Sequence, residues 1–263
     1  YALFTHNIIN FTDNLSLTLG LRYNHETKDI DTNLTSTVPA CSFFQNPATA
    51  PYRAALTSSG LFGSAFLLTC NPTVNSEFNG VRSGDRSESE FTGTAKLAFK
   101  VNDDVLVYGG YDRGYKSGGY NLDRGSFDSI LLGGDGAQVA DLEFGNETVD
   151  AYEIGIKTNF TRQFQFNASL FYSDFKGYQS NRFLGNSFVV LNYDKLVSQG
   201  VELESIIRPH PDLAFNLGYT YVDAKVTDPL AGSDNDRQAS NQPKHTITGA
   251  MTSASANFTL IVK

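Results

Sequence analysis

Arg113, Lys116 and Tyr120 are candidate ligand-binding side chains. They lie in the glycine-rich stretch Val107–Asn121, where cationic and hydroxyl groups could contact an anionic or sugar-like molecule. Glycines at the end of a strand also relieve crowding and allow twist without any ligand. Both interpretations stay open for each of the three residues.

Other reactive residue types do not assemble into an active site. The four histidines show neither the spacing of metal ligands nor a partnered nucleophile. Asp234-Asn235-Asp236 lacks the spacing and the bidentate glutamate of an EF-hand loop. Gly133-Gly134-Asp135-Gly136 is not followed by the Lys-Ser/Thr pair of a phosphate-binding loop. We therefore predict no catalytic residue, no metal site and no cofactor.

The composition restricts the class of protein. The 263 residues carry a formal charge of −8, with 18% charged and 13% aromatic residues. This acidic balance argues against a nucleic-acid-binding protein, and the aromatic content argues against disorder. No run of about 18 apolar residues is present, so no membrane-spanning helix is expected. Membrane β-barrels have a mean hydropathy near that of soluble proteins, so the composition does not exclude them.

Apolar and polar residues alternate with a period of two along most of the chain. In Leu15–Lys28, leucines and a tyrosine at every second position alternate with polar residues and a glycine. This period is typical of a strand with one apolar and one polar face, and no helical pattern appears. The sequence predicts an all-β, antiparallel, up-and-down fold of about nine to ten strands. The predicted strands are Tyr1–Ile9, Leu15–Lys28, Phe91–Val101, Val105–Lys116, Val149–Thr158, Phe164–Ser173, Val189–Ile207, Leu213–Val226 and Lys244–Ala256.

The predicted connections alternate between short turns and longer loops. An up-and-down barrel in an outer membrane has this property, because its turns lie on one side and its loops on the other. A soluble sandwich or lipocalin has no reason to separate loop lengths in this way. The connections are Phe11–Asn14, Asp29–Glu90, Asn102–Asp104, Ser117–Thr148, Asn159–Gln163, Arg182–Phe188, Pro209–Asp212 and Thr227–Pro243.

Tyrosines cluster near the ends of the predicted strands. Aromatic girdles at the two membrane interfaces would produce this distribution, although strands are in general rich in aromatic residues. The residues concerned are Tyr23, Tyr108, Tyr111, Tyr115, Tyr152, Tyr172, Tyr219 and Tyr221.

Several stretches resemble the barrel of TonB-dependent outer-membrane receptors. Leu17–Tyr23 is similar to the family's L-x-x-G-L-R-Y strand, and Val107–Asn121 to its Y-x-x-Y-x-R-G-Y-K-x-G-G-Y-N stretch. Glu147–Lys157 resembles E-x-x-x-x-Y-E-L-G-x-K, Gly200–Glu204 matches G-V-E-L-E, and Pro243–Thr246 matches P-x-H-T. These motifs occur in the family's order and cover most of the chain.

The resemblance implies that residues 1–263 form part of a larger receptor barrel, of about 22 strands, whose lumen is filled by a plug. The plug and the segment that contacts TonB have no counterpart in this sequence. The resemblance also implies import of a scarce, bulky nutrient such as an iron–siderophore complex across the outer membrane of a Gram-negative bacterium. The expected partners are outer-membrane lipid, the TonB system through the plug, and a small-molecule iron chelate. No nucleic acid is expected, and the full-length receptor would be a monomer.

If the family lumen is present, charged residues of the polar strand faces would line it. They would pair with plug residues, line a transient pathway or simply be solvated. The residues predicted to face the lumen are Arg22, Lys96, Glu153, Lys157, Glu202 and Glu204.

Cys41 and Cys70 both fall in the predicted loop Asp29–Glu90. Two cysteines in one external loop of an envelope protein favour a disulfide. By restricting the unfolded loop, it would stabilise the folded loop by roughly 3–4 kcal/mol. A metal site is the alternative, but the pair lacks further ligands nearby.

Two other classes of protein share parts of this pattern. A passive porin-like or adhesin barrel has the same strand alternation, and a soluble all-β binding module can have it too. The order of the family motifs separates a receptor from a porin. Substrate identity lies in loops that the sequence does not decode.

Overall fold

The computed structural model of the chain describes residues 1–183, 188–227, 237–253 and 258–262. Asp234-Asn235-Asp236, in the predicted loop Thr227–Pro243, therefore lie outside the described residues. None of the helices in the described ranges is both long and apolar enough to cross a membrane. The strands are β1 Ala2–Asn10, β2 Leu15–Leu34, β3 Gly80–Asn102, β4 Val105–Lys116, β5 Gly119–Tyr120, β6 Glu143–Phe144, β7 Glu147–Thr161, β8 Phe164–Phe183, β9 Phe188–His210, β10 Leu213–Thr227, β11 Arg237–Gln238, β12 His245–Ser253 and β13 Phe258–Val262, and the α-helices are α1 Pro39–Gln45, α2 Ala50–Ser58 and α3 Phe62–Thr69.

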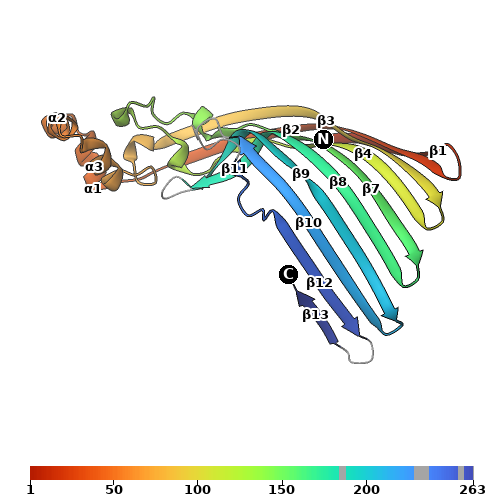
Figure 1. Cartoon of the computed structure of the whole chain (residues 1–263). Coiled ribbons are helices and arrows are strands. Elements are labelled where there is room, and N and C mark those ends of the chain that lie inside the picture. Colours follow the sequence, from red (N-terminus) through yellow and green to blue (C-terminus); the bar gives the residue numbers. More distant parts are fainter. Residues whose placement is uncertain (184–187, 228–236, 254–257, 263) are drawn as a thin grey trace.

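One large antiparallel sheet dominates the structure (Figure 1). Its strands follow the order β1-β2-β3-β4-β7-β8-β9-β10-β12-β13, with β11 paired to β10. Each strand pairs with its neighbour in the chain once the short strands β5, β6 and β11 are set aside, which is an up-and-down arrangement. The predicted all-β fold and its antiparallel topology are confirmed. The sheet is an open part of a barrel, with β1 and β13 at its two edges.

The strand register places the alternating residues on two chemically different faces. One row across the sheet contains Leu17, Leu97, Ile154 and Leu170, with Gly109 between Leu97 and Ile154. The next row, on the opposite face, contains Thr18, Lys96, Gly110 and Glu153. We call these the apolar face and the polar face.

Tyrosines form a row on the apolar face, towards the end of the sheet that carries the long connections. The Tyr111 and Tyr152 rings have centroids 5.2 Å apart, and Tyr152 and Tyr172 follow at 6.4 Å. Phe160 and Phe164 stack at 6.1 Å beside the short turn between β7 and β8. Tyr152 and Phe160 are eight residues apart, about 26 Å along a strand. At a strand tilt of about 40° this is roughly 20 Å in height, somewhat less than the ~25 Å apolar band of a membrane barrel.

One of the predicted girdle tyrosines lies on the other face, and another contacts Glu88 of β3. Tyr108 is on the polar face, where its ring covers Gly155 so closely that a Cβ at Gly155 would lie 2.6 Å from the ring. Tyr115 alternates with Tyr111 and so keeps the register of the apolar face, while its hydroxyl donates a hydrogen bond to Glu88 at 2.6 Å. The prediction was wrong for Tyr108, because position near a strand end does not fix which face a side chain occupies.

The predicted loop Asp29–Glu90 was too long, because β2 and β3 continue as a paired hairpin as far as Leu34 and Gly80. Figure 1 shows this hairpin extending past the other strands towards α1–α3. We call residues 24–34 and 80–90 the arm. Outside the lipid band both faces of a hairpin can be polar, so the apolar alternation that marks a membrane strand is absent from the arm.

The prediction that no helix is present was also wrong. The connection from β2 to β3 holds α1, α2 and α3, each of seven to nine residues. Helices this short leave little periodic signal, and they are stabilised by packing rather than by propensity. Phe66 of α3 is buried against Cys41 and Cys70, with Val38, Phe44 and Phe62 around them. We call residues 35–79 the cap.

Candidate functional site

The sheet divides at Gly93 and Arg113, the last paired residues of β3 and β4 on the loop side. Beyond this fork the arm continues on its own, and the connection that follows β4 (residues 117–146, the covering loop) folds over the arm's polar face. Lys28 of β2 donates hydrogen bonds to Ser117 Oγ at 2.6 Å and to the Gly118 carbonyl at 2.7 Å. The covering loop therefore closes over the polar face just beyond the fork.

Glu88 of β3 anchors the start of the covering loop. Its carboxylate accepts hydrogen bonds from the Tyr115 hydroxyl at 2.6 Å and the Gly118 N–H at 3.1 Å, and it contacts Arg86. Burial alone would raise the pKa of Glu88, but these donors and the Arg86 charge outweigh burial and lower the pKa below its ordinary value. Burial and the neighbouring Glu88 raise the pKa of Tyr115. The pair is therefore a carboxylate and a protonated phenol at neutral pH.

An apolar core lies between the arm and the covering loop. Ile30 of the arm, Phe78 of the cap, and Phe127 and Leu142 of the covering loop are buried together. The side chain of Val139 fills the space over Gly84, where a Cβ would lie only 2.7 Å from it. This core holds arm, cap and covering loop as one unit.

Amide side chains attach the covering loop to β9. Asn121 forms a reciprocal pair with the backbone of Val190 in β9, accepting at 2.7 Å and donating at 3.0 Å. Asn192 accepts from the Gly145 N–H at 2.6 Å and donates to the Gly177 carbonyl at 2.7 Å. Sequence reasoning missed these residues, because single amides paired across 15 to 69 positions leave no local pattern.

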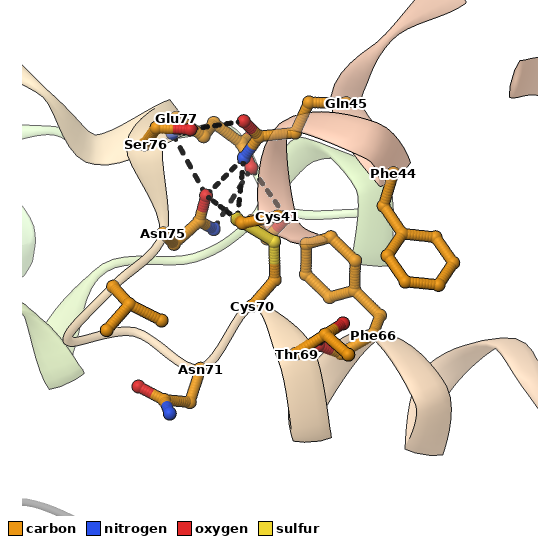
Figure 2. The surroundings of a disulfide bond; sticks show 12 residues. Cys41, Phe44, Gln45, Phe66, Thr69, Cys70, Asn71, Asn75, Ser76 and Glu77 are labelled. Atoms are coloured by element: carbon orange, nitrogen blue, oxygen red, sulfur yellow. Dashed lines mark hydrogen bonds between the residues drawn. A yellow bond between two sulfur atoms is a disulfide. The ribbon is translucent and has the colours of Figure 1, made fainter. Parts of the chain in front are cut away.

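The cap is closed by a disulfide between Cys41 and Cys70, whose Cα atoms are 4.8 Å apart (Figure 2). Both cysteines are buried. Next to them, Gln45 donates to the Asn75 side-chain oxygen and accepts from Ser76 Oγ at 2.5 Å, as the dashed lines show. The alternative of a metal pair does not apply, since the sulfurs are bonded to each other.

The cap is joined to the covering loop by charged side chains. Glu77 accepts hydrogen bonds from Ser129 Oγ at 2.7 Å and from the Ile130 N–H at 2.6 Å. Arg124 donates to the carbonyls of Thr73 and Asn75 at 3.1 and 3.2 Å. A cavity of about 400 Å³ remains between the two segments, lined by Phe66, Leu67, Cys70, Pro72, Asn75, Phe78 and residues 127–129 and 132–134.

The structure separates the three residues predicted to form one ligand site. Arg113 bridges Asp150 of β7, at 3.0 and 3.3 Å, and Glu90 of β3, at 3.8 Å. Lys116 is exposed at the end of β4. Tyr120 packs into the core between arm and covering loop, and its buried hydroxyl has no hydrogen-bond partner among the described residues. Burial raises the pKa of this phenol.

A larger cavity, of about 780 Å³, opens at the fork. Its lining brings Arg113 together with Arg22, a residue predicted to face the lumen, and adds the polar side chains of Asn24, Glu26 and Ser117. Arg22 donates to Asn24 Oδ1 at 2.6 Å. The register puts Arg22 on the polar face, whereas Arg113 lies in the row of the apolar face and its guanidinium is already paired with Asp150 and Glu90. Arg22 is therefore the cation at this cavity that could accept an anionic ligand.

All the residues predicted to face the lumen share the polar face. The register carries this face from Arg22 in β2 through Lys96 in β3 and Glu153 and Lys157 in β7 to Glu202 and Glu204 in β9. Lys96 pairs with Asp112 at 3.1 Å, and the Lys157 ammonium lies 5.4 Å from the centre of the Tyr108 ring. Across the described ranges, no three His, Cys, Asp or Glu residues gather as a metal site.

The chain resembles known proteins over almost its whole length. Residues 1–260 match the family model described as TonB dependent receptor-like, beta-barrel. No curated protein sequence matches the chain.

Solved structures share the fold at low sequence identity. The ferric yersiniabactin uptake receptor FyuA from Yersinia pestis aligns over 96% of this chain and 30% of its own, with a TM-score of 0.63 and 16% identity. The siderophore receptor PiuA from Acinetobacter baumannii covers 96% and 30%, with a TM-score of 0.61 and 16% identity. The copper transporter OprC covers 95% and 32%, with a TM-score of 0.61 and 15% identity.

The chain thus spans about a third of the length of these structures. The family match, the up-and-down strand order and the apolar and polar faces of the sheet all support the same fold. The chain belongs to the TonB-dependent receptor-like β-barrel family, a family of receptors and transporters rather than enzymes.

Proposed function

We propose that this chain is part of the barrel of an outer-membrane receptor in a Gram-negative bacterium, and that the receptor imports a scarce, bulky nutrient such as an iron–siderophore complex. FyuA is a ferric yersiniabactin uptake receptor and PiuA a siderophore receptor, and both share this fold. The observation that carries the proposal is the polar face, with its charged rows and a covering loop closed over its outer end.

In this proposal the polar face lines the lumen of the completed barrel. A plug formed by residues outside this chain would occupy the lumen, and the TonB system would act on the plug. Lys96, Glu153, Lys157, Glu202 and Glu204 would then meet plug side chains or line the pathway that opens during transport. The complete receptor would act as a monomer, surrounded by outer-membrane lipid.

The ligand would first contact the loop side of the receptor. The fork cavity is the proposed position, because Arg22 of the polar face lines it and its guanidinium suits an anionic chelate. Lys116 lies exposed nearby in sequence, at the end of β4, and would attract an anion without fixing its orientation. Tyr120 would act indirectly, by holding the covering loop.

The test is energy-dependent uptake by the full-length receptor that carries this chain. Cells would be supplied with iron-55 bound to a panel of siderophores, and with copper, because a copper transporter shares the fold. Uptake of one ferric chelate that stops when the TonB system is removed is the expected result. Uptake that continues without the TonB system would show a passive barrel instead.

The role of Arg22 can be tested in the same cells. Arg22→Gln should weaken ligand binding about tenfold or more, because a hydrogen-bonded charge is lost from the cavity. Arg162→Gln, in the short turn between β7 and β8, is the matched control and should leave binding unchanged. Both variants should keep the heat-modifiable gel migration of a folded barrel. Equal binding by the two variants would remove the fork cavity from the proposal.

A further inference from the structure

A band of basic side chains crosses the apolar face of the sheet on the side of the long connections. It comprises Lys176 of β8, Lys195 of β9, Lys225 of β10 and Lys244, which precedes β12. Their carboxylate partners Asp150, Asp174 and Asp223 come from β7, β8 and β10. We call the four lysines the lysine stripe. Charged residues on the face that should meet lipid require an explanation.

Every lysine of the stripe has an aspartate within ion-pair distance. Lys176 Nζ lies 3.7 Å from Asp150, and Lys195 Nζ lies 3.2 Å from Asp174. Lys225 and Lys244 share Asp223, at 3.7 and 3.6 Å. Most of these contacts are longer than a strong charged hydrogen bond. An ammonium group has three N–H donors, so each lysine retains donors for another acceptor.

The two signs of charge are exposed to different degrees. The lysine side chains are 43–64% exposed, whereas the aspartates are only 16–20% exposed. The carboxylates therefore lie close to the sheet and the ammonium groups point outwards. With Arg113 and its second partner Glu90 included, five cations meet four carboxylates in a chain whose formal charge is −8. The stripe is a local cationic surface on an acidic protein.

The stripe lies immediately outside the tyrosine row. On β8, Tyr172 is paired with Tyr152, and Lys176 follows four residues later on the same face. On β10, Lys225 lies four residues beyond Tyr221, which contacts His245. Tyrosines of a membrane barrel mark the level of the lipid headgroups. The stripe is therefore at the height of the headgroups, on the leaflet that faces the long loops.

We infer that the lysine stripe binds the phosphate groups of the lipid that surrounds the barrel on its loop side. The inference rests on the proposed function, because it requires the apolar face to lie in a membrane. Phosphate is a charge-dense acceptor that suits the compact ammonium of lysine. The opposite side of the sheet provides a comparison, because Lys96 and Asp112 form a similar pair there, at 3.1 Å and half exposed, but on the polar face.

The experiment uses the full-length receptor in non-ionic detergent micelles. Bisphosphorylated lipid A is the probe, its dephosphorylated form and inorganic phosphate are the comparison ligands, and calorimetric titration gives the dissociation constants. The K176Q/K195Q/K225Q/K244Q variant should bind the probe at least a hundredfold more weakly, since each basic residue near an anionic surface contributes roughly fivefold. K96Q should bind like the wild type, and the fourfold Lys→Arg variant should retain binding. Binding to the wild type should weaken as salt is raised.

Several outcomes would overturn the inference. Equal binding of phosphorylated and dephosphorylated lipid A would show an apolar contact, and equal binding of inorganic phosphate would show a site for free anions. Loss of binding in K96Q would place the lipid on the polar face, contrary to the inference. A wild type that self-associates through the stripe and ignores the lipid would assign the surface to a second copy. If the fourfold variant does not fold, K195Q/D174N removes one complete pair and should weaken binding about fivefold.

This experiment is independent of transport. Normal lipid binding without uptake of any ferric chelate would refute the proposed function and leave the lysine stripe intact. Normal uptake by the fourfold variant together with unchanged lipid binding would refute the stripe alone.

Discussion

The cap buries its apolar side chains, whereas the sheet leaves those of its apolar face exposed. In the cap, Cys41, Phe66 and Phe78 are at most 1% exposed, because helices and covering loop close around them. In the sheet, Ile154 and Leu170 remain 62% and 54% exposed on the apolar face. Such exposure is unfavourable in water and favourable against hydrocarbon. The cap is thus built for water and the apolar face for lipid, within one chain.

This difference separates the forces that stabilise the two regions. The stability of the strands depends on backbone hydrogen bonds between neighbouring strands and on lipid contact with their apolar face. The cap depends on a small core, a disulfide and side-chain hydrogen bonds between segments that are far apart in sequence. Changes in one region should therefore leave the other largely unaffected. The following predictions test that separation.

The largest effect is expected in the cap. Replacing Cys41 and Cys70 together by serine removes a link between residues 29 positions apart and should lower the free energy of opening the cap by about 3–4 kcal/mol. Amide hydrogen exchange within α1 and α3 measures this opening. Exchange in β7 and β8 should not change. Equal acceleration in the strands would show that the cap and the sheet unfold together.

A slightly smaller effect is expected on the apolar face. Leu170→Lys puts a cation where hydrocarbon should lie and should destabilise the folded barrel by about 2–4 kcal/mol. Ser169→Lys, the next residue on the same strand, is the control and should cost much less because Ser169 belongs to the polar face. Urea titration of the full-length receptor folded into phosphatidylcholine vesicles gives both values. If Ser169→Lys proves the more harmful, the assignment of the faces is reversed.

The sheet was predictable because lipid imposes one simple rule on every strand. Leu17, Leu97 and Leu170 alternate with polar neighbours, so a period of two revealed the strands and their faces. The arm was missed because one of its faces meets water and the other meets the covering loop, so neither face shows the uniform apolar alternation of a lipid-facing strand. The cap was missed for a related reason. Its helices are specified by contacts such as Phe66 with Cys41, which a single sequence does not display.

The candidate site was predictable only in part. Charged residues of the polar face could be assigned by alternation, and the register places all of them there. Sequence proximity was a poor guide to the candidate ligand-binding residues. Arg113 bridges strands, Lys116 is exposed and Tyr120 packs in a core. Glu88 and Asn192 were missed, because their importance arises only when the covering loop returns to the sheet.

The fork links the two regions and should show an intermediate effect. Among the described residues, Arg113→Met leaves Asp150 with Tyr111, at 2.7 Å, and Lys176, at 3.7 Å. We expect a loss of about 1–2 kcal/mol, reduced from the value of a fully buried pair because Arg113 is partly exposed. Lys116→Met is the control and should be nearly neutral. Thermal unfolding of both variants measures the difference, and equal melting temperatures would argue against a structural role for Arg113.

The smallest effect should come from the pH dependence of the covering loop. The pKa of Glu88 is lowered on folding, so its carboxylate contributes stability above the ordinary value of 4.5, and that stability is lost as the pH falls through the lowered pKa. Protonation would weaken the contacts to Gly118 and Arg86 and loosen the start of the loop. Hydrogen exchange at Gly118, followed from pH 7 towards acid and corrected for intrinsic rates, should therefore show reduced protection below pH 4.5. Glu88→Gln should abolish this step while the cap amides stay protected. A step that persists in Glu88→Gln would place the titrating group elsewhere, and protection that rises on acidification would contradict the sign of the shift.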